Sequence, residues 1–280
     1  MRINNDVMQR LDAVEFPTLP SLVMRLAQLL GQSHTTTDEI AAAVELDATM
    51  AARVLRLANS VMLGGVGEVE SVSEAVIRVG VDGVRDIVFA LSMMGVMRPV
   101  NLEYRPFWRH SLAVAHTARV LQGRAQRIET EFPETYSAGL LHDMGMLVLD
   151  RALGSQYKRV VAEAQRSGRP LCEVEQEMLG LDHAEAGARL LKVWEMPVRL
   201  IDAAQLHHRP RHSESRVTHL VYLADLICNN LGFHNGTGYL PRTYVDQAWS
   251  DLGLAETDFP EIALEVRRGV EQLERIIATA

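Results

Sequence analysis

The second half of the chain carries histidines and aspartates in a pattern that could bind metal ions. His110 and Asp225 each share a predicted helix face with apolar side chains, and the pair His142-Asp143 ends an apolar segment. A carboxylate on an apolar face is costly to bury unless it is paired or binds a cation. The candidate ligands, called the His/Asp set below, are His110, His142, Asp143, His183, His207, His208 and Asp225.

The residue types in the His/Asp set favour a transition metal. Neutral imidazole together with carboxylate suits iron, manganese, zinc or nickel, whereas calcium prefers a shell made of oxygen atoms. A carboxylate that lies between two ions could bridge them, as two-metal hydrolytic sites require. The expected cofactor is therefore a divalent transition metal, Fe, Mn, Zn or Ni.

Each member of the set also has an ordinary structural explanation. A single histidine on an apolar helix face is most often a core residue, and a His-Asp dipeptide is common. An inward aspartate can simply cap a neighbouring helix or pair with an arginine. His208 is ambiguous because it follows His207, and adjacent residues on a helix point about 100° apart. Only the joint occurrence of these residues, in this order, favours a metal site.

The other histidines and both cysteines are interpreted as structural or surface residues. Two cysteines give no disulfide framework and no cysteine-rich metal site. The sequence contains no phosphate-binding loop of the Walker type and no nucleophile elbow. The residues in question are His34, His116, His212, His219, His234, Cys172 and Cys228.

The elements that must position the set are predicted to be helices. Aromatic residues make up only 5% of the chain while hydrophobic residues make up 48%, which suits packed helices better than a β-sandwich. No sustained period-two alternation bounded by hairpin turns is present. The first helix is expected to follow Pro17 and Pro20. The predicted helices cover residues 22–30, 40–46, 48–58, 75–79, 81–94, 107–122, 135–142, 157–166, 183–194, 197–208, 216–231 and 260–279.

Short signals predict where several of these helices begin and end. Capping boxes, in which the first and fourth residues bond reciprocally, are indicated at residues 36–39 and 71–74. Asp47 and Asp182 are candidate N-caps. Gly145 is expected to end the helix that precedes it.

The overall charge of the chain disfavours some classes of binding partner. The 280 residues include 28 Lys and Arg against 36 Asp and Glu, which gives a formal net charge of −8. Nucleic-acid binding needs clustered positive charge, so it is disfavoured. The N-terminus lacks the apolar segment of a signal peptide, and no apolar run reaches membrane-spanning length. With so few cysteines, we expect a cytoplasmic protein that does not enter a membrane.

Motifs in the two halves resemble two related families. In the second half, His110 is followed by LLHDMG at 140–145, DHAEAG at 182–187, HHRP at 207–210 and LAD at 223–225. This order resembles the HD superfamily of metal-dependent phosphohydrolases, especially its HD-GYP branch. In the first half, FPTLP at 16–20, ELDATM at 45–50, VLRLANS at 54–60 and SEAVIRVG at 73–80 resemble the HDOD family. HDOD domains are HD-related output domains of bacterial signalling proteins.

The resemblance implies an all-α fold in which an N-terminal helical subdomain packs on an HD-like bundle. The expected organisation is an extension at 1–15, the subdomain at 16–98, the HD-like core at 99–235 and a C-terminal helical extension at 236–280.

The resemblance also implies roles for the His/Asp set. Four residues match the primary metal ligands of HD enzymes, and three match the positions that hold a second ion in HD-GYP proteins, with Asp143 as the bridge. The primary ligands would be His110, His142, Asp143 and Asp225; the second ion would be held by His183, His207 and His208.

The sequence departs from the HD-GYP pattern at several positions. Met146 stands where that pattern has a lysine, and Arg209-Pro210 stands where its acidic and Gly-Tyr-Pro elements begin. Pro106 replaces a glutamate one turn before the first histidine. The later Gly-Thr-Gly-Tyr run at 236–239 is interpreted as a loop that matches by coincidence. Hydrolysis of cyclic-di-GMP is therefore not expected.

Two functions follow as hypotheses, with a third set aside. The favoured one is a bacterial signal-transduction output module that binds a protein partner or small phosphate ligand, with a retained metal site and little or no catalysis. The alternative is a metal-dependent phosphohydrolase acting on a nucleotide or other phosphate ester. DNA contact through arginines of the first half is disfavoured by the acidic chain.

Overall fold

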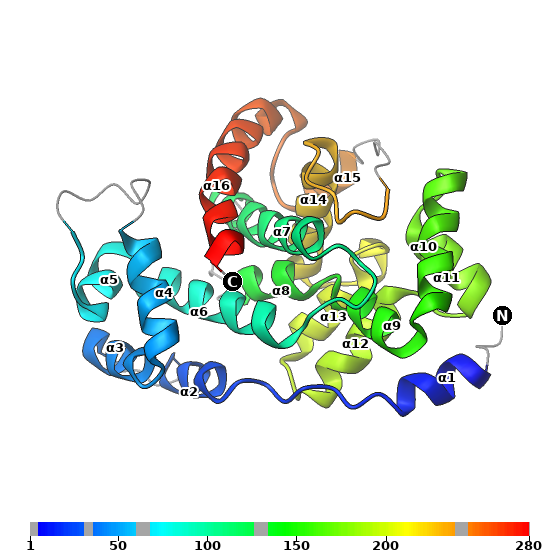
Figure 1. Ribbon diagram of the computed structural model, residues 1–280. Helices are drawn as coiled ribbons and strands as arrows, with labels where there is room; N and C mark the ends of the chain where they lie inside the picture. Colours follow the sequence, from blue (N-terminus) through cyan, green and yellow to red (C-terminus); the bar gives the residue numbers. More distant parts are fainter. Residues whose placement is uncertain (1–4, 31–35, 60–67, 126–133, 239–245, 280) are drawn as a thin grey trace. The chain divides into compact units, whose positions relative to one another are not determined.

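The computed structural model describes residues 5–30, 36–59, 68–125, 134–238 and 246–279 (Figure 1). Over these residues the regular elements are helices, and no strand is present. The predicted all-α class is therefore confirmed.

Contacts divide the chain into two compact units. One unit comprises Pro17–Met97 with Glu274–Ala280, and we call it the N-terminal unit. The other comprises Met1–Phe16 with Arg98–Leu273, and we call it the large unit. The finer domain boundaries stated above stay a prediction.

The N-terminal unit is built from five helices whose apolar faces meet in one core. Ile40 and Val44 on one helix, Val54 on the next and Val76 on a third are almost completely buried. The helices are α2 (Ser21–Leu30), α3 (Thr37–Glu45), α4 (Ala48–Ala58), α5 (Val72–Val79) and α6 (Val81–Val96).

The capping signals of this unit are largely confirmed. Thr36 and Glu39 form the reciprocal capping box at the start of α3. The carboxylate of Asp47 accepts from the backbone N–H of Met50 at 3.0 Å and caps α4. Ser71 caps α5 through the N–H of Glu74, but the Glu74 carboxylate accepts from the N–H of residue 70 instead of closing the box.

The large unit includes an N-terminal helix that the sequence analysis did not predict. The expectation that the first helix follows Pro17 is wrong, because α1 (Asn5–Asp12) precedes it and buries Val7 and Leu11. The remaining helices of this unit are α7 (Tyr104–Arg124), α8 (Thr135–Leu141), α9 (Met144–Leu153), α10 (Ser155–Ser167), α11 (Leu171–Leu179), α12 (His183–Val193), α13 (Val198–Leu206), α14 (Arg216–Asn230) and α15 (Asp246–Asp251), with short 3-10 turns η2 (Pro210–His212) and η3 (Glu256–Asp258). The last helix, α16 (Phe259–Thr279), belongs to this unit as far as Leu273.

Gly145 does not end a helix, which corrects the sequence-based expectation. It lies in the first turn of α9, a helix that the sequence analysis missed. A Cβ at Gly145 would lie 1.8 Å from the carbonyl oxygen of His183 and 2.5 Å from the nitrogen of Gly187. The glycine is therefore a contact residue that lets α9 and α12 approach backbone to backbone.

A second glycine allows a similar approach between α7 and α8. A Cβ at Gly139 would lie 2.6 Å from the Cα of Ala115. These two close contacts bring the end of α8, the middle of α7 and the start of α12 to one place. Among the described residues, no helix has the length and apolarity needed to span a membrane.

Candidate metal centre

The structure brings the whole His/Asp set together in the large unit. His110 lies on α7, and His142 with Asp143 forms the break between α8 and α9. His183 is the first residue of α12, where Asp182 is the predicted N-cap. The remaining members are His207 and His208, directly after α13, and Asp225 on α14; all of the set are buried except His208, which is half-buried.

One group of ligand atoms forms around His110. Its Nε2 lies 3.3 Å from Nε2 of His142, 3.5 Å from Oδ2 of Asp143 and 3.2 Å from Oδ1 of Asp225. The Nε2 of His142 lies 3.4 Å from the same Oδ2 of Asp143. Two imidazoles and two carboxylates thus face a common point.

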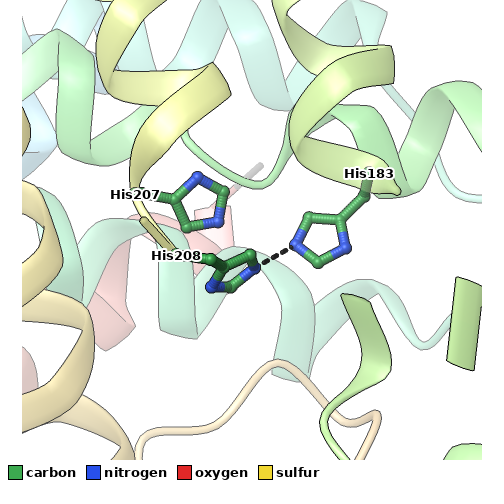
Figure 2. Close-up of side chains that lie close together, drawn as sticks. All are labelled: His183, His207 and His208. Carbon is green, nitrogen blue, oxygen red and sulfur yellow. Dashed lines mark hydrogen bonds between the residues drawn. The ribbon is translucent and has the colours of Figure 1, made fainter. Parts of the chain in front are cut away.

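A second group forms around His183. Figure 2 shows the rings of His183 and His208 turned toward each other, with their Nε2 atoms 2.8 Å apart and His207 beside them. Oδ1 of Asp143 lies 3.3 Å from Nε2 of His183 and 3.5 Å from Nε2 of His207. Asp143 therefore offers one oxygen to each group, which is the arrangement of a bridging carboxylate.

The opposite ring nitrogen of four histidines is held by an oxygen acceptor. Carbonyl and carboxylate oxygens only accept, so each of these Nδ1 atoms must carry the proton, which leaves each Nε2 with a lone pair. This is the orientation that outer hydrogen bonds impose on metal-binding histidines. The bonds join His110 to the Phe233 carbonyl (2.6 Å), His142 to the Gly139 carbonyl (2.7 Å), His207 to the Ala204 carbonyl (2.8 Å) and His183 to Glu175 Oε2 (2.6 Å).

Converging lone pairs could bind a cation. In the His110–His142 pair two Nε2 atoms face each other at 3.3 Å, whereas the Nε2 atoms of His183 and His208 lie at a hydrogen-bond distance of 2.8 Å. Nε2 of His207 is buried and has no hydrogen-bond partner among the residues that the structure describes. The donor set of imidazole nitrogen and carboxylate oxygen therefore fits divalent transition metal ions, and this His/Asp cluster could bind them.

The electrostatics of the His/Asp set favour positive charge at the site. Burial disfavours the charged imidazolium of His142 and His183, but adjacent carboxylates outweigh it and raise the pKa of both, that of His183 well above its usual value. Burial lowers the pKa of His207. Burial also opposes ionisation of Asp143, yet the surrounding imidazoles hold the pKa of that carboxyl well below its usual range.

A pocket of about 150 Å³ opens onto the cluster, with Asp143, His183, His208 and Asp225 among its lining residues. Two amides in its wall hold the carboxylates. Asn229 Nδ2 donates to Asp225 Oδ1 at 2.6 Å, and Asn235 Nδ2 donates to Asp143 Oδ2 at 2.8 Å.

The pocket wall carries one cation among the described lining residues, Arg169. Its guanidinium already contacts the carboxylates of Glu177 at 2.6 Å and Glu173 at 3.8 Å. A bound anion would therefore depend on the cluster for compensating charge.

Sequence reasoning missed three polar residues that contact the set, Asn229, Glu175 and Asn235. Glu175 is fully buried and accepts from His183, and its position four residues from both Leu171 and Leu179 was a usable signal, because a carboxylate there falls on an apolar helix face. Asn235 lies in a loop and offered no such signal. Its neighbours Thr237 and Gly238 line the pocket, so part of the run at 236–239 belongs to the pocket wall. Residue 239 lies outside the described residues.

The residues set aside in the sequence mostly make structural contacts. Cys228 is buried beside the Thr117 hydroxyl, and burial raises the pKa of its thiol. His219 donates to backbone carbonyls near η2, and His212 is exposed. Cys172 differs from the expectation of a packing residue, because it is half-buried and lines the pocket. His34 lies outside the described residues.

Comparison with known families gives one match that covers most of the chain. The family described as HDOD domain matches residues 16–210. A curated but uncharacterised protein of Treponema pallidum (strain Nichols) is 24% identical over 207 residues, which is 74% of this chain and 40% of that protein. The chain thus spans about two fifths of the length of this relative.

Solved structures share the fold over nearly the whole chain. An HDOD domain protein of unknown function from Geobacter sulfurreducens is 25% identical, with a TM-score of 0.83 over 99% of this chain and 97% of that one. A candidate signal transduction protein from Marinobacter aquaeolei VT8 is 21% identical, with a TM-score of 0.83 over 98% of this chain and 65% of that one. A candidate phosphohydrolase from Shewanella amazonensis SB2B is 24% identical, with a TM-score of 0.73 over 97% and 98% of the two chains.

Proposed function

Because the chain belongs to the HDOD domain family, we propose that it is a signalling output module that holds two divalent transition metal ions in its His/Asp set. His110, His142 and Asp225 would hold the first ion, His183, His207 and His208 would hold the second, and Asp143 would contribute one carboxylate oxygen to each. Iron, manganese, zinc and nickel all suit these ligands.

One observation carries the proposal. Four histidines donate their Nδ1 protons to oxygen acceptors outside the set, so their Nε2 atoms face the two oxygens of Asp143. A merely structural histidine cluster would instead satisfy its Nε2 atoms with donors, because buried polar atoms are normally hydrogen-bonded.

Metal analysis of the full chain tests the proposal. We expect chain purified without chelators, or reloaded with Mn²⁺, Fe²⁺ or Zn²⁺, to retain about two ions after gel filtration. His212→Ala is the matched control, because it removes an exposed histidine and should leave the metal content unchanged. Chain that retains no transition metal under any of these loadings would rule the proposal out.

As an output module the chain would signal through a protein partner or a small phosphate ligand at the pocket. The replacement of the HD-GYP lysine by Met146 supports binding over turnover, since a thioether cannot supply a positive charge to a phosphate. Met146 is fully buried and its sulfur contacts the Asn235 amide at 3.4 Å, so it belongs to the packing beside Asp143.

A second candidate function, hydrolysis of a small phosphate ester, is favoured by the pocket itself. A pocket that opens onto a bridging carboxylate gives a phosphate direct access to both ion positions. Bound ions would supply Lewis-acid stabilisation of charge at phosphorus. Asn229 and Asn235 would keep Asp225 and Asp143 oriented while water adds to phosphorus and the alcohol leaves with a proton.

Phosphate release separates the two functions. Hydrolysis of p-nitrophenyl phosphate or nucleoside monophosphates by the Mn²⁺-loaded chain, abolished by Asp143→Ala, would support the enzyme. Metal-loaded chain that binds phosphate without turnover would support the output module.

A further inference from the structure

A buried chain of polar side chains leads from α10 to the second ion position. The hydroxyl of Tyr157 donates to Oε1 of Glu175 at 2.6 Å. Oε2 of Glu175 accepts from Nδ1 of His183 at 2.6 Å and from the backbone N–H of the same residue at 2.8 Å. Tyr157 and Glu175 are completely buried. Both carboxylate oxygens accept from donors, which fits an ionised carboxylate.

This contact distinguishes His183 from the other oriented histidines. His110, His142 and His207 donate Nδ1–H to neutral backbone carbonyls, whereas His183 donates to a carboxylate. A carboxylate at that position fixes the ring and raises the basicity of the opposite nitrogen toward a metal. Nε2 of His183 is therefore the strongest imidazole donor of the four.

The two ion positions differ in the charge of their direct ligands. The first is faced by two carboxylates, those of Asp143 and Asp225. Among the described residues, the second is faced by three imidazoles and by the shared oxygen of Asp143. A divalent ion in a buried site needs compensating negative charge. Glu175 lies one hydrogen bond behind the second position and supplies it.

Resting on the two-ion function proposed above, we propose that Glu175 is a positioning residue that makes the second ion position bind through the charge it places behind His183. The first position has no need of Glu175, because its own carboxylates balance the ion. Loss of the Glu175 charge should therefore empty the second position and spare the first.

The substitution Glu175→Gln tests the charge with little change of shape. A glutamine can keep its oxygen toward both donors of His183 and turn its amide toward the Tyr157 oxygen. We expect ion binding at the second position to weaken about 10- to 100-fold, the range for outer hydrogen-bond partners of metal ligands. Tyr157→Phe keeps the Glu175 charge and removes only the Tyr157 hydroxyl, so it should weaken binding of the same ion less.

Titration of metal-free full chain with Mn²⁺ or Zn²⁺, followed by calorimetry and by metal analysis, gives the readout. His208→Ala identifies the second binding step and Asp225→Asn the first, since each removes a ligand of one position only. Metal-free Glu175→Gln should still unfold in one cooperative thermal transition, which separates the charge effect from misfolding.

The expected result is two binding steps in the unsubstituted chain and only the first, unchanged step in Glu175→Gln at matched concentrations. Two unaltered steps in Glu175→Gln, or equal weakening of both, would overturn the role of Glu175 and leave the two-ion function intact. An unsubstituted chain that binds no ion would overturn both.

Discussion

At the scale of single residues, Asp143 links the two histidine groups. Its two oxygens face different groups, at 3.3–3.5 Å from the nearest imidazole nitrogens. The pair His142-Asp143 is therefore a metal-binding candidate only together with the residues around it, because a His-Asp dipeptide alone is common. Its chemistry depends on four other helices that bring ligands to it.

Asp143→Asn should lower the affinity for both ions. The amide offers only one acceptor oxygen, so one position loses a ligand, and both positions lose the shared negative charge. We expect a loss larger than the roughly 10- to 100-fold that outer-shell substitutions cost. Equilibrium dialysis against Zn²⁺ measures it, with Asp150→Asn as the control, because Asp150 is an equally buried aspartate that accepts from the backbone at residues 100–102. An Asp143→Asn chain that keeps one ion at full affinity would contradict the bridge.

The residues of the site were predictable to different degrees. The ligands were found because histidines and aspartates on apolar faces are costly without a partner, and their order matched a known pattern. Glu175 carried the same signal but lay on a helix rich in exposed glutamates, Glu173 and Glu177, which hid it. Asn235 could not be predicted, because a loop amide approaches Asp143 only through tertiary folding.

At the scale of elements, the site depends on how closely α9 and α12 pack. Gly145 and Gly187 lie at their contact, and the same contact sets the distance from Asp143 to His183. The sequence predicted α12 and its cap but not α9, since a glycine after an apolar segment reads as a helix end. The close approach of the α9 and α12 backbones explains why position 145 is a glycine.

Gly145→Ala should destabilise the large unit. The added methyl meets the His183 carbonyl, so the helices must separate, which typically costs about 1–3 kcal/mol. Urea unfolding of the metal-free chain measures the change in the free energy of unfolding. Gly123→Ala, near the end of α7 with open space around it, is the control and should be neutral or stabilising by up to about 1 kcal/mol. Equal stability of the two variants would contradict the packing argument.

The contact between α7 and α16 predicts a pH effect on stability. Nε2 of His116 is buried without a hydrogen-bond partner in the described part of the chain, and a Cβ at Gly269 would lie 1.9 Å from it. Burial lowers the pKa of His116, and Arg119 adds to this while Glu265 opposes it. The other charged groups around the same cavity are Arg124, Glu261 and Arg268.

Since the folded chain holds the pKa of His116 below the unfolded value near 6.5, the unfolded chain binds more protons as the pH falls below that value. The free energy of unfolding should then decrease between pH 7 and pH 5, by at most about 1.4 kcal/mol per pH unit from this group. His116→Gln should flatten that dependence, and His212→Gln should not. If the free energy of unfolding varies with pH in the same way for His116→Gln and for the unsubstituted chain, His116 does not cause the pH effect.

At the scale of the whole molecule, charge decides what the pocket can accept. The chain has a net charge of −8, and the one cation among the described pocket-lining residues is already paired with glutamates. An acidic protein repels anions at a distance, so attraction must come from the ions. The all-α class and the family could be predicted from composition and motifs. The charge state of the pocket was not predicted, because the sequence analysis missed α11, the helix that carries both partners of Arg169, Glu173 and Glu177.

Binding of inorganic phosphate should therefore require metal. We expect calorimetry to detect phosphate binding to Zn²⁺- or Mn²⁺-loaded chain, and at least about tenfold weaker binding to metal-free chain, since two divalent charges are lost. Arg169→Gln should change the loaded affinity little, because that guanidinium already serves two glutamates. Equal phosphate affinity with and without metal would contradict this account of the pocket.

Anomalous diffraction from crystals of metal-loaded chain tests the central claim most directly. The account predicts two peaks at the absorption edge of the loaded metal, one between His110 and His142 and one between His183 and His208, on either side of the Asp143 carboxylate. Absence of both peaks from fully loaded crystals, or peaks only at sites away from Asp143, would contradict it.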